Sequence, residues 1–222
     1  MENLTDSLDL LSAIKTGKKP ADPVALQTAL NAVISLSAEE TRNLTESMNG
    51  LENLTEEKNG MRAEYLALLD GFRAYLEAAK RNATKEASAE ETVRGARQLK
   101  EWRDGTYTPG ISPVVDFVAV LENKQSIVTA HMRLISIIKD EKKIRGLLAG
   151  GKTASFLRLL KKAQGEISRA TQLNWQADKL LLAPDADGNR DGETIDATIG
   201  DANGLLNGAY DDFAAMSALV KK

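Results

Sequence analysis

The stretch TASFLRLLKKAQGEISRATQLNWQADKLLL, residues 153–182, shows most clearly what kind of fold this chain adopts. Its apolar residues recur at steps of three and four, the spacing that places side chains on one face of an α-helix. They are Phe156, Leu160, Ala163, Ile167, Ala170, Leu173, Ala177 and Leu180. Polar and charged residues fill most other positions, so the pattern predicts a long amphipathic helix with one buried face.

The same spacing extends over most of the chain. It predicts a short helix over 23–34, a long helix over 37–76, and further helices over 88–103, 112–147 and 195–220. No segment alternates apolar and polar residues for long, as a half-buried strand would. The expected fold is therefore all-α: an up-and-down bundle of long amphipathic helices with two short N-terminal helices. We expect a single domain over 1–222, with the short helices of 1–36 packed on the bundle.

Helix boundaries are suggested by capping and turn residues. The pentapeptide SAEET occurs at Ser37–Thr41 and at Ser88–Thr92, and each copy predicts a capping box that starts a helix. Gly50 and Gly60 are weak points in the long helix, where a kink is expected. The sequence DGTYTPG at 104–110 is dense in turn residues, so it predicts a reversal of the chain.

The composition excludes several classes of function. The chain has 222 residues, 42% of them hydrophobic, and a formal net charge of −3, so it can build a core and nucleic acid is not the expected partner. It has no cysteine and one histidine, which excludes disulfides, thiolate metal sites and paired-histidine metal sites. No apolar run approaches the roughly 18–20 residues that span a bilayer, so we expect a soluble chain without a transmembrane segment.

Two charged regions lie in the last third of the chain. The segment 139–169 holds nine lysines and arginines against three acids, which would suit an anionic lipid, a polymer or nucleic acid. The segment 185–212 holds eight acids against one arginine. The two segments can instead offset each other within the fold, and the sequence favours this second interpretation.

The octapeptide GLLAGGKT, Gly146–Thr153, matches the phosphate-binding pattern G-x-x-x-x-G-K-[ST]. That pattern works when a buried strand leads into the glycine loop, but the residues before it, KDEKKIR, predict the charged end of a helix. Gly150 and Gly151 then end one helix and Thr153 starts the next. A nucleotide hydrolase that uses Lys152 and Thr153 is therefore only a minor alternative.

The octapeptide DADGNRDG, residues 185–192, places oxygen-bearing side chains at alternate positions within an acidic loop, 183–193. Counted from Asp187, it supplies the first half of an EF-hand loop, but Thr198 stands where a bidentate glutamate is needed. Counted from Asp185, it supplies more carboxylates, but Arg190 replaces the turning glycine. The candidate ligands are Asp185, Asp187, Asn189, Asp191, Glu193 and Asp196.

Over about a dozen residues this loop resembles the calcium loops of EF-hand, dockerin and thrombospondin-type modules. The resemblance implies a weak structural Ca²⁺ site, and a solvated turn is the alternative. Calcium binding in the millimolar class would favour a periplasmic or secreted location over the cytoplasm, and the compartment is otherwise left open.

These observations together favour a non-enzymatic helical protein, bacterial in character, that presents helix faces to a protein partner or a small ligand. A homo-oligomer is also compatible, because the apolar stripes would serve a second copy equally well. The main alternative is an extracytoplasmic sensor or ligand-binding domain. A cavity lined by polar groups between the long helices would favour that alternative.

Overall fold

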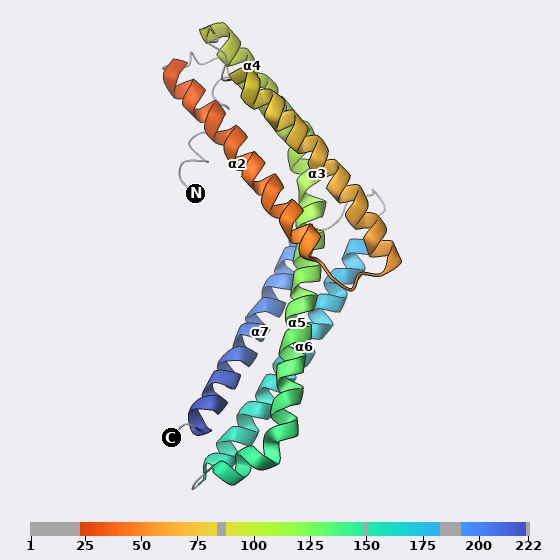
Figure 1. The fold of residues 1–222 in the computed structure, drawn as a ribbon, viewed down its shortest axis with the longest axis vertical. Helices are drawn as coiled ribbons and strands as arrows, with labels where there is room; N and C mark the ends of the chain where they lie inside the picture. Colours follow the sequence, from red (N-terminus) through yellow and green to blue (C-terminus); the bar gives the residue numbers. More distant parts are fainter. Residues whose placement is uncertain (1–22, 84–87, 149–150, 183–191, 221–222) are drawn as a thin grey trace. The chain divides into compact units, whose positions relative to one another are not determined.

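The computed structural model describes residues 23–83, 88–148, 151–182 and 192–220, and these ranges contain helices and no β-strand. Figure 1 shows the helices along the chain. They are α2 (Pro23–Gly50), α3 (Glu56–Ala83), α4 (Ala89–Trp102), the π-helical turn η1 (Arg103–Tyr107), α5 (Thr108–Leu147), α6 (Lys152–Leu182) and α7 (Gly192–Val220). The all-α prediction is confirmed.

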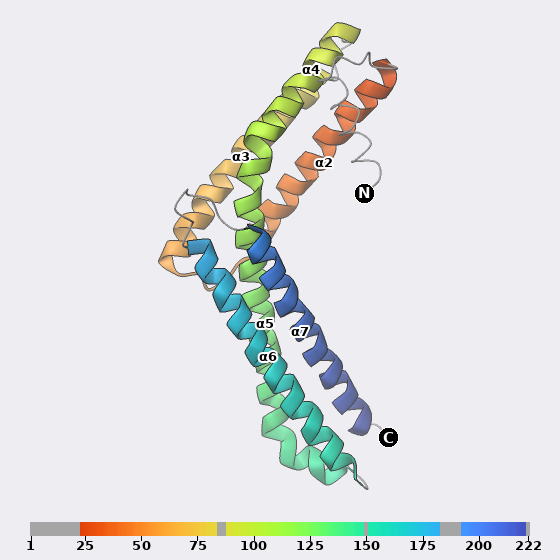
Figure 2. The same cartoon turned by 180° about the vertical axis from the view of Figure 1, so that it is seen from behind.

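The chain divides into two compact units, Met1–Val115 and Asp116–Lys222, with the boundary inside α5. Unit 1 contains α2, α3, α4, η1 and the start of α5, and unit 2 contains the rest of α5 with α6 and α7. Figures 1 and 2 show that helices joined by a loop lie beside each other in opposite directions, which is the predicted up-and-down arrangement. The single domain expected from the sequence stays a prediction.

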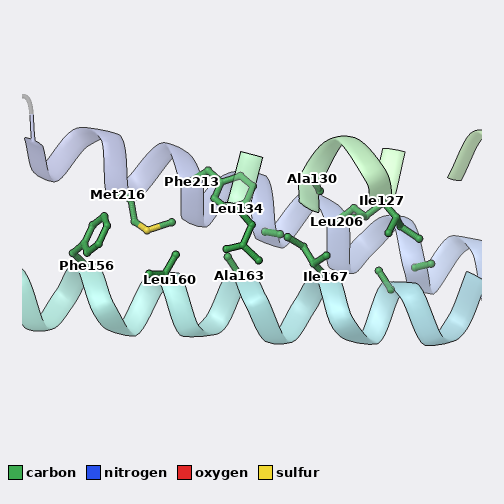
Figure 3. Packing of buried hydrophobic residues seen from close by; sticks show 13 residues of the cluster. Ile127, Ala130, Leu134, Phe156, Leu160, Ala163, Ile167, Leu206, Phe213 and Met216 are labelled. Atoms are coloured by element: carbon green, nitrogen blue, oxygen red, sulfur yellow. The ribbon is translucent and has the colours of Figure 1, made fainter. Parts of the chain in front are cut away.

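The core of unit 2 is formed by all three of its helices. Figure 3 shows Phe156, Leu160, Ala163 and Ile167 of α6 pointing into the layer where α5 and α7 also place their apolar side chains. Phe156 is 1% exposed and Ile167 is fully buried, so the stripe that predicted α6 is its packing face.

Two polar contacts join the same three helices. Asn174, buried in α6, donates from Nδ2 to the Val120 carbonyl of α5 at 2.8 Å. Asn123 of α5 donates from Nδ2 to Oδ1 of Asn203 in α7 at 2.7 Å. A buried amide must find a partner, so these two contacts fix the register of the helices more tightly than apolar packing alone.

Unit 1 is held together by an aromatic cluster. Tyr75 of α3 stacks on Trp102 of α4 with ring centroids 4.0 Å apart. Phe72 of α3 lies 5.7 Å from Trp102 and 5.0 Å from Tyr107 of η1. Phe72 and Tyr107 are buried. Large buried rings contribute strongly to a core, so this cluster anchors α3 against α4 and η1.

The two SAEET copies have different roles. At Ser88 the predicted capping box is present: the Ser88 amide donates to Glu91 Oε2 at 2.8 Å, and the Glu91 amide donates to Ser88 Oγ at 3.3 Å. At Ser37 the prediction is wrong, because α2 continues through it from Pro23 to Gly50. Ser37 and Thr41 are buried in the middle of that helix, where contacts with η1 override the capping tendency.

The predicted helices over 23–34 and 37–76 are also wrong in their boundaries. The first is the beginning of α2, and the second is interrupted after Gly50, before α3 begins at Glu56. Asn53 in this connection has φ of 55°, a left-handed conformation that asparagine tolerates better than most residues. Gly50 was an expected weak point. The other short N-terminal helix that the sequence predicts would lie within residues 1–22, outside the described residues.

The predicted reversal at 104–110 is wrong as well. The chain stays helical from α4 into α5, and the Thr108 amide donates to the Arg103 carbonyl five residues back, as in a π-helix. Pro109, which lacks an amide hydrogen, directly follows Thr108 in α5. Tyr107, at the centre of the predicted turn, is 1% exposed, and its burial favours a continuous helix.

Two helical glycines are expected to respond to alanine in opposite ways. At Gly110 of α5 an added Cβ would lie 2.7 Å from Cζ of the buried Phe72. At Gly71 of α3 it would meet no atom within 4 Å. Urea unfolding should therefore show that Gly110→Ala lowers the free energy of unfolding by about 1–3 kcal/mol. Gly71→Ala should raise the free energy of unfolding by about 1 kcal/mol. Equal effects of the two substitutions would contradict the close contact between Gly110 and Phe72.

A candidate ligand cavity in unit 1

A partly enclosed cavity of about 530 Å³ lies between the three long helices of unit 1. Its walls come from α2 (Gln27, Leu30, Ile34), α3 (Tyr75, Ala78, Ala79, Asn82, Ala83) and α4 (Glu91, Thr92, Arg94, Gly95, Gln98, Leu99). Small-molecule sites in proteins have volumes of roughly 300–1,000 Å³, so the cavity is large enough for a small organic ligand.

Small residues keep the cavity open. Ala78 and Ala79 of α3 and Gly95 of α4 stand where larger side chains would fill the space between the helices. A Cβ on Gly95 would lie 3.8 Å from Cδ2 of Leu30, an ordinary contact distance, so this glycine is not required by close packing. Together with Leu30, Ile34 and Leu99, which are buried, these residues give the cavity an apolar wall.

Gln27 joins the three helices that form the cavity. From α2 its Nε2 donates to the Ala83 carbonyl of α3 at 2.8 Å, and its Oε1 accepts from Thr92 Oγ1 of α4 at 3.2 Å. Thr92 is buried and also lies 3.2 Å from the Ser88 carbonyl. Because both ends of the amide are engaged, Gln27 fixes the spacing of the helices around the cavity.

Polar groups complete the lining. Asn82, Arg94 and Gln98 are exposed, and each can hydrogen-bond the polar end of a ligand. Burial raises the pKa of the Tyr75 hydroxyl, which therefore stays a neutral donor and acceptor. Backbone and side-chain hydrogen bonds from Ser88 lower the pKa of Glu91, which stays a carboxylate. The arrangement can bind an amphipathic molecule with its apolar part inward and its polar end toward solvent.

The signal for this cavity in the sequence is weak. The pair Ala78–Ala79 follows the last of the larger apolar residues of α3, and Gly95 occurs in the middle of α4. Small residues at core-facing positions can mean either close helix contact or a gap, and only the packing of α2 decides between these. No residue was therefore predicted from the sequence to form this site.

A second polar cluster was also missed. Tyr107 of η1 donates to Glu40 Oε2 at 2.7 Å, and its hydroxyl oxygen also lies 3.1 Å from the Ser37 carbonyl. Arg103 donates to Ser37 Oγ. Burial is the main reason why the pKa of Tyr107 is raised well above its usual value, and Glu40 raises it further. This network holds η1 against the middle of α2.

The raised pKa of Tyr107 predicts loss of stability in alkali. The folded state holds the phenolic proton more tightly than the unfolded chain does, so the contribution is complete below the ordinary pKa of about 10 and is lost as the pH rises through the folded value. Thermal unfolding followed from pH 8 upward should show a steeper alkaline decline for the wild type than for Tyr107→Phe, at about pH 10 and above. Identical declines would contradict the role given to this hydroxyl.

Unit 2 contains a charged cluster that links α6 to α7. Lys162 Nζ lies 3.0 Å from Asp212 Oδ1 and 3.3 Å from Glu166 Oε1. Asp212 is buried, and hydrogen bonds first to Asp212 and then to Glu166 raise the pKa of Lys162. A Cβ on Gly208 of α7 would lie 2.8 Å from Glu166 Oε1, so this glycine makes room for the carboxylate.

Four of the candidate calcium ligands, Asp185, Asp187, Asn189 and Asp191, lie outside the described residues. Glu193 and Asp196 are described, and both lie near the start of α7. Within the described ranges no three histidine, cysteine, aspartate or glutamate side chains come together as a metal site would require. Calcium binding by the loop 183–193 stays a prediction.

Thermal unfolding tests the calcium prediction directly. A ligand at a concentration about a hundredfold above its Kd stabilises the native state by about 2.7 kcal/mol. Circular dichroism in millimolar Ca²⁺ should then show a higher midpoint than in EDTA, with Mg²⁺ as control. Asp187→Ala should remove the difference, and no difference in the wild type would leave the loop a solvated connection.

The pattern GLLAGGKT does not have the surroundings of a phosphate-binding loop. Gly146 and Leu147 are the last residues of α5, and Lys152 and Thr153 begin α6. The element before the glycines is thus a helix, as the charged sequence indicated, whereas the phosphate loop needs a strand. Gly151 has φ of 76°, a conformation suited to glycine after a helix end.

None of the described helices is long and apolar enough to cross a bilayer. No family model matches the chain, and neither the curated proteins nor the solved structures contain a match to it.

Proposed function

We propose that the protein is a non-enzymatic helical binding protein whose unit 1 takes a small amphipathic ligand in the cavity between α2, α3 and α4. The observation that carries this proposal is the cavity itself: about 530 Å³ with an apolar wall and several polar groups at its edge. Such a combination is the usual form of a small-molecule site. It is also the feature that favours the ligand-binding alternative over a purely structural bundle.

The lining indicates the kind of ligand. Leu30, Ile34 and Leu99 favour an apolar chain or ring. Arg94, exposed in the lining, favours a carboxylate or sulfonate at the polar end, because a guanidinium binds planar or tetrahedral oxyanions well. Glu91 also lines the cavity and interacts with Arg94, so the ligand that fits this arrangement is an amphipathic anion whose polar end binds on the Arg94 side.

Equilibrium titration with 1-anilinonaphthalene-8-sulfonate tests this proposal, because the probe combines aromatic rings with a sulfonate. We expect saturable fluorescence with one site per chain. Ala79→Phe, which fills the cavity, should weaken binding by about tenfold or more, the effect of 1.4 kcal/mol. Ala74→Phe places the same side chain on an exposed position of α3 outside the lining and should leave binding unchanged.

Circular dichroism establishes whether both variants keep the helix content of the wild type. If Ala79→Phe unfolds, Gly95→Leu provides a second way to fill the cavity, from α4. Unsaturable binding, or equal binding by Ala79→Phe and Ala74→Phe, would contradict the proposal.

A further inference from the structure

The end of unit 2 where α5 meets α6 carries a concentration of positive charge. Between Lys139 and Lys161 there are seven cations against two acids. Arg145 pairs with Glu141 at 3.3 Å, and within the part of the chain that the structure describes Lys139, Lys142 and Lys143 have no ion-pair partner. We call this surface the basic end. Its cations are Lys139, Lys142, Lys143, Arg145, Lys152, Arg158 and Lys161.

The basic end is not neutralised by the third helix of unit 2. Figures 1 and 2 both show the last turns of α7 at the same end of unit 2 as the first turns of α6. The last eight described residues of α7, FAAMSALV (213–220), contain no charged side chain. Glu193, Asp196 and Asp201 precede this segment by several turns. Asp211 and Asp212 directly precede it, and Asp212 already pairs with Lys162. The sequence favoured mutual neutralisation of the basic segment 139–169 and the acidic segment 185–212. At this end of unit 2 that neutralisation is incomplete, and the surface keeps a positive charge.

Large apolar side chains are exposed among these cations. Leu147, the last residue of α5, is 64% exposed, Ile138 is 43% exposed, and Leu157 of α6 is 36% exposed. A surface groove of about 650 Å³ runs beside Ile138. Its lining consists of Ile138, Lys139, Glu141, Lys142, Arg145, Gly146 and Thr153. Exposed leucine beside several lysines suits a partner that is both anionic and apolar.

From this combination we infer that the basic end docks on an anionic membrane surface. Lipid phosphates would meet the lysines and arginines while Leu147 enters the boundary between headgroups and acyl chains. A nucleic acid or another polyanion would meet the same charge but would leave the leucines in water. A second copy of this end would bring like charges together. The interaction is peripheral and separate from the cavity of unit 1.

Flotation of the full-length protein with vesicles tests the inference. We expect binding to phosphatidylcholine mixed with anionic phosphatidylglycerol, and little binding to phosphatidylcholine alone. Each cation near such a surface contributes about fivefold in partitioning, so Lys142→Glu with Lys143→Glu should weaken binding by about 25-fold or more. Ionic strength of about 1 M, where the Debye length is about 3 Å, should release the protein.

Matched control variants show whether binding depends on the basic end itself or only on the net charge and surface hydrophobicity of the protein. Lys124→Glu reverses an exposed charge elsewhere on α5, about 27 Å from Lys142 along a helix that rises 1.5 Å per residue, and should have little effect. Leu147→Ser should weaken binding by about fivefold, whereas Met132→Ser, at a residue 65% exposed, should not.

Three results would overturn the inference. The first is equal binding to neutral and anionic vesicles, and the second is an equal loss in Lys124→Glu and in Lys142→Glu with Lys143→Glu. The third is binding to heparin or duplex DNA, without vesicle binding, that Leu147→Ser leaves unchanged. Circular dichroism of each variant confirms that the helices are intact. Vesicle binding should not depend on the cavity of unit 1. We therefore expect Ala79→Phe to bind vesicles as the wild type does.

Discussion

Replacing Phe156 with alanine is expected to lower the free energy of unfolding by about 3–5 kcal/mol, the usual cost of removing a large ring from a core. Phe156 is 1% exposed and packs among the side chains of all three helices of unit 2, close to Met216 in Figure 3. Its removal leaves a void that the packed side chains of the core fill only in part.

Urea unfolding followed by circular dichroism measures this effect. Met132→Ala, at a residue 65% exposed on α5, is the control and should change the free energy by less than about 0.5 kcal/mol. A loss below about 1 kcal/mol for Phe156→Ala would mean that α6 does not bury this face against α5 and α7.

The second large effect is expected at Phe72, because its ring contacts Trp102 and Tyr107 and occupies the space next to Gly110. Phe72→Ala should lower the free energy of unfolding by about 3–5 kcal/mol. It should also change the emission of Trp102, whose edge contact with the ring is lost.

A double-mutant cycle of Gly110→Ala and Phe72→Ala measures the interaction between these two positions. The cost of Gly110→Ala comes from a collision with Phe72, so this cost should disappear when Phe72 is already alanine. The combined variant should therefore be no less stable than Phe72→Ala alone. Strictly additive losses would show that Gly110 is required for a reason other than the Phe72 ring.

The spacing of apolar residues predicts most of the helices. It fails at particular residues whose structure is decided by contacts with distant parts of the chain. The stripe from Phe156 to Ala177 predicted α6 because a helix with one apolar face can bury it only against other helices. The two SAEET copies are locally identical, yet only Ser88 caps a helix. At Ser37 the hydrogen bonds to Arg103 and Tyr107, more than 60 residues away, decide the outcome.

The turn predicted at 104–110 fails for the same kind of reason. Aspartate, glycine and proline favour turns locally, but burial of Tyr107 against α2 and α3 favours a continuous helix. The cavity was not predictable from spacing, since it depends on the distance between α2 and the small residues Ala79 and Gly95. The charge of the basic end was visible in the sequence, but the exposure of Leu147 was not.

The central claim, that unit 1 binds an amphipathic anion between its helices, is tested most directly by the emission of Trp102. This residue stacks on Tyr75, which lines the cavity, while Trp175 lies in unit 2 and can be replaced by phenylalanine. Decanoate, which does not absorb where tryptophan does, is titrated into the Trp175→Phe protein below its micelle concentration. We predict a saturable change with one midpoint, which Ala79→Phe moves to about tenfold higher concentration or more and Ala74→Phe leaves in place. An unchanged spectrum, or the same response in Ala79→Phe, would contradict the claim.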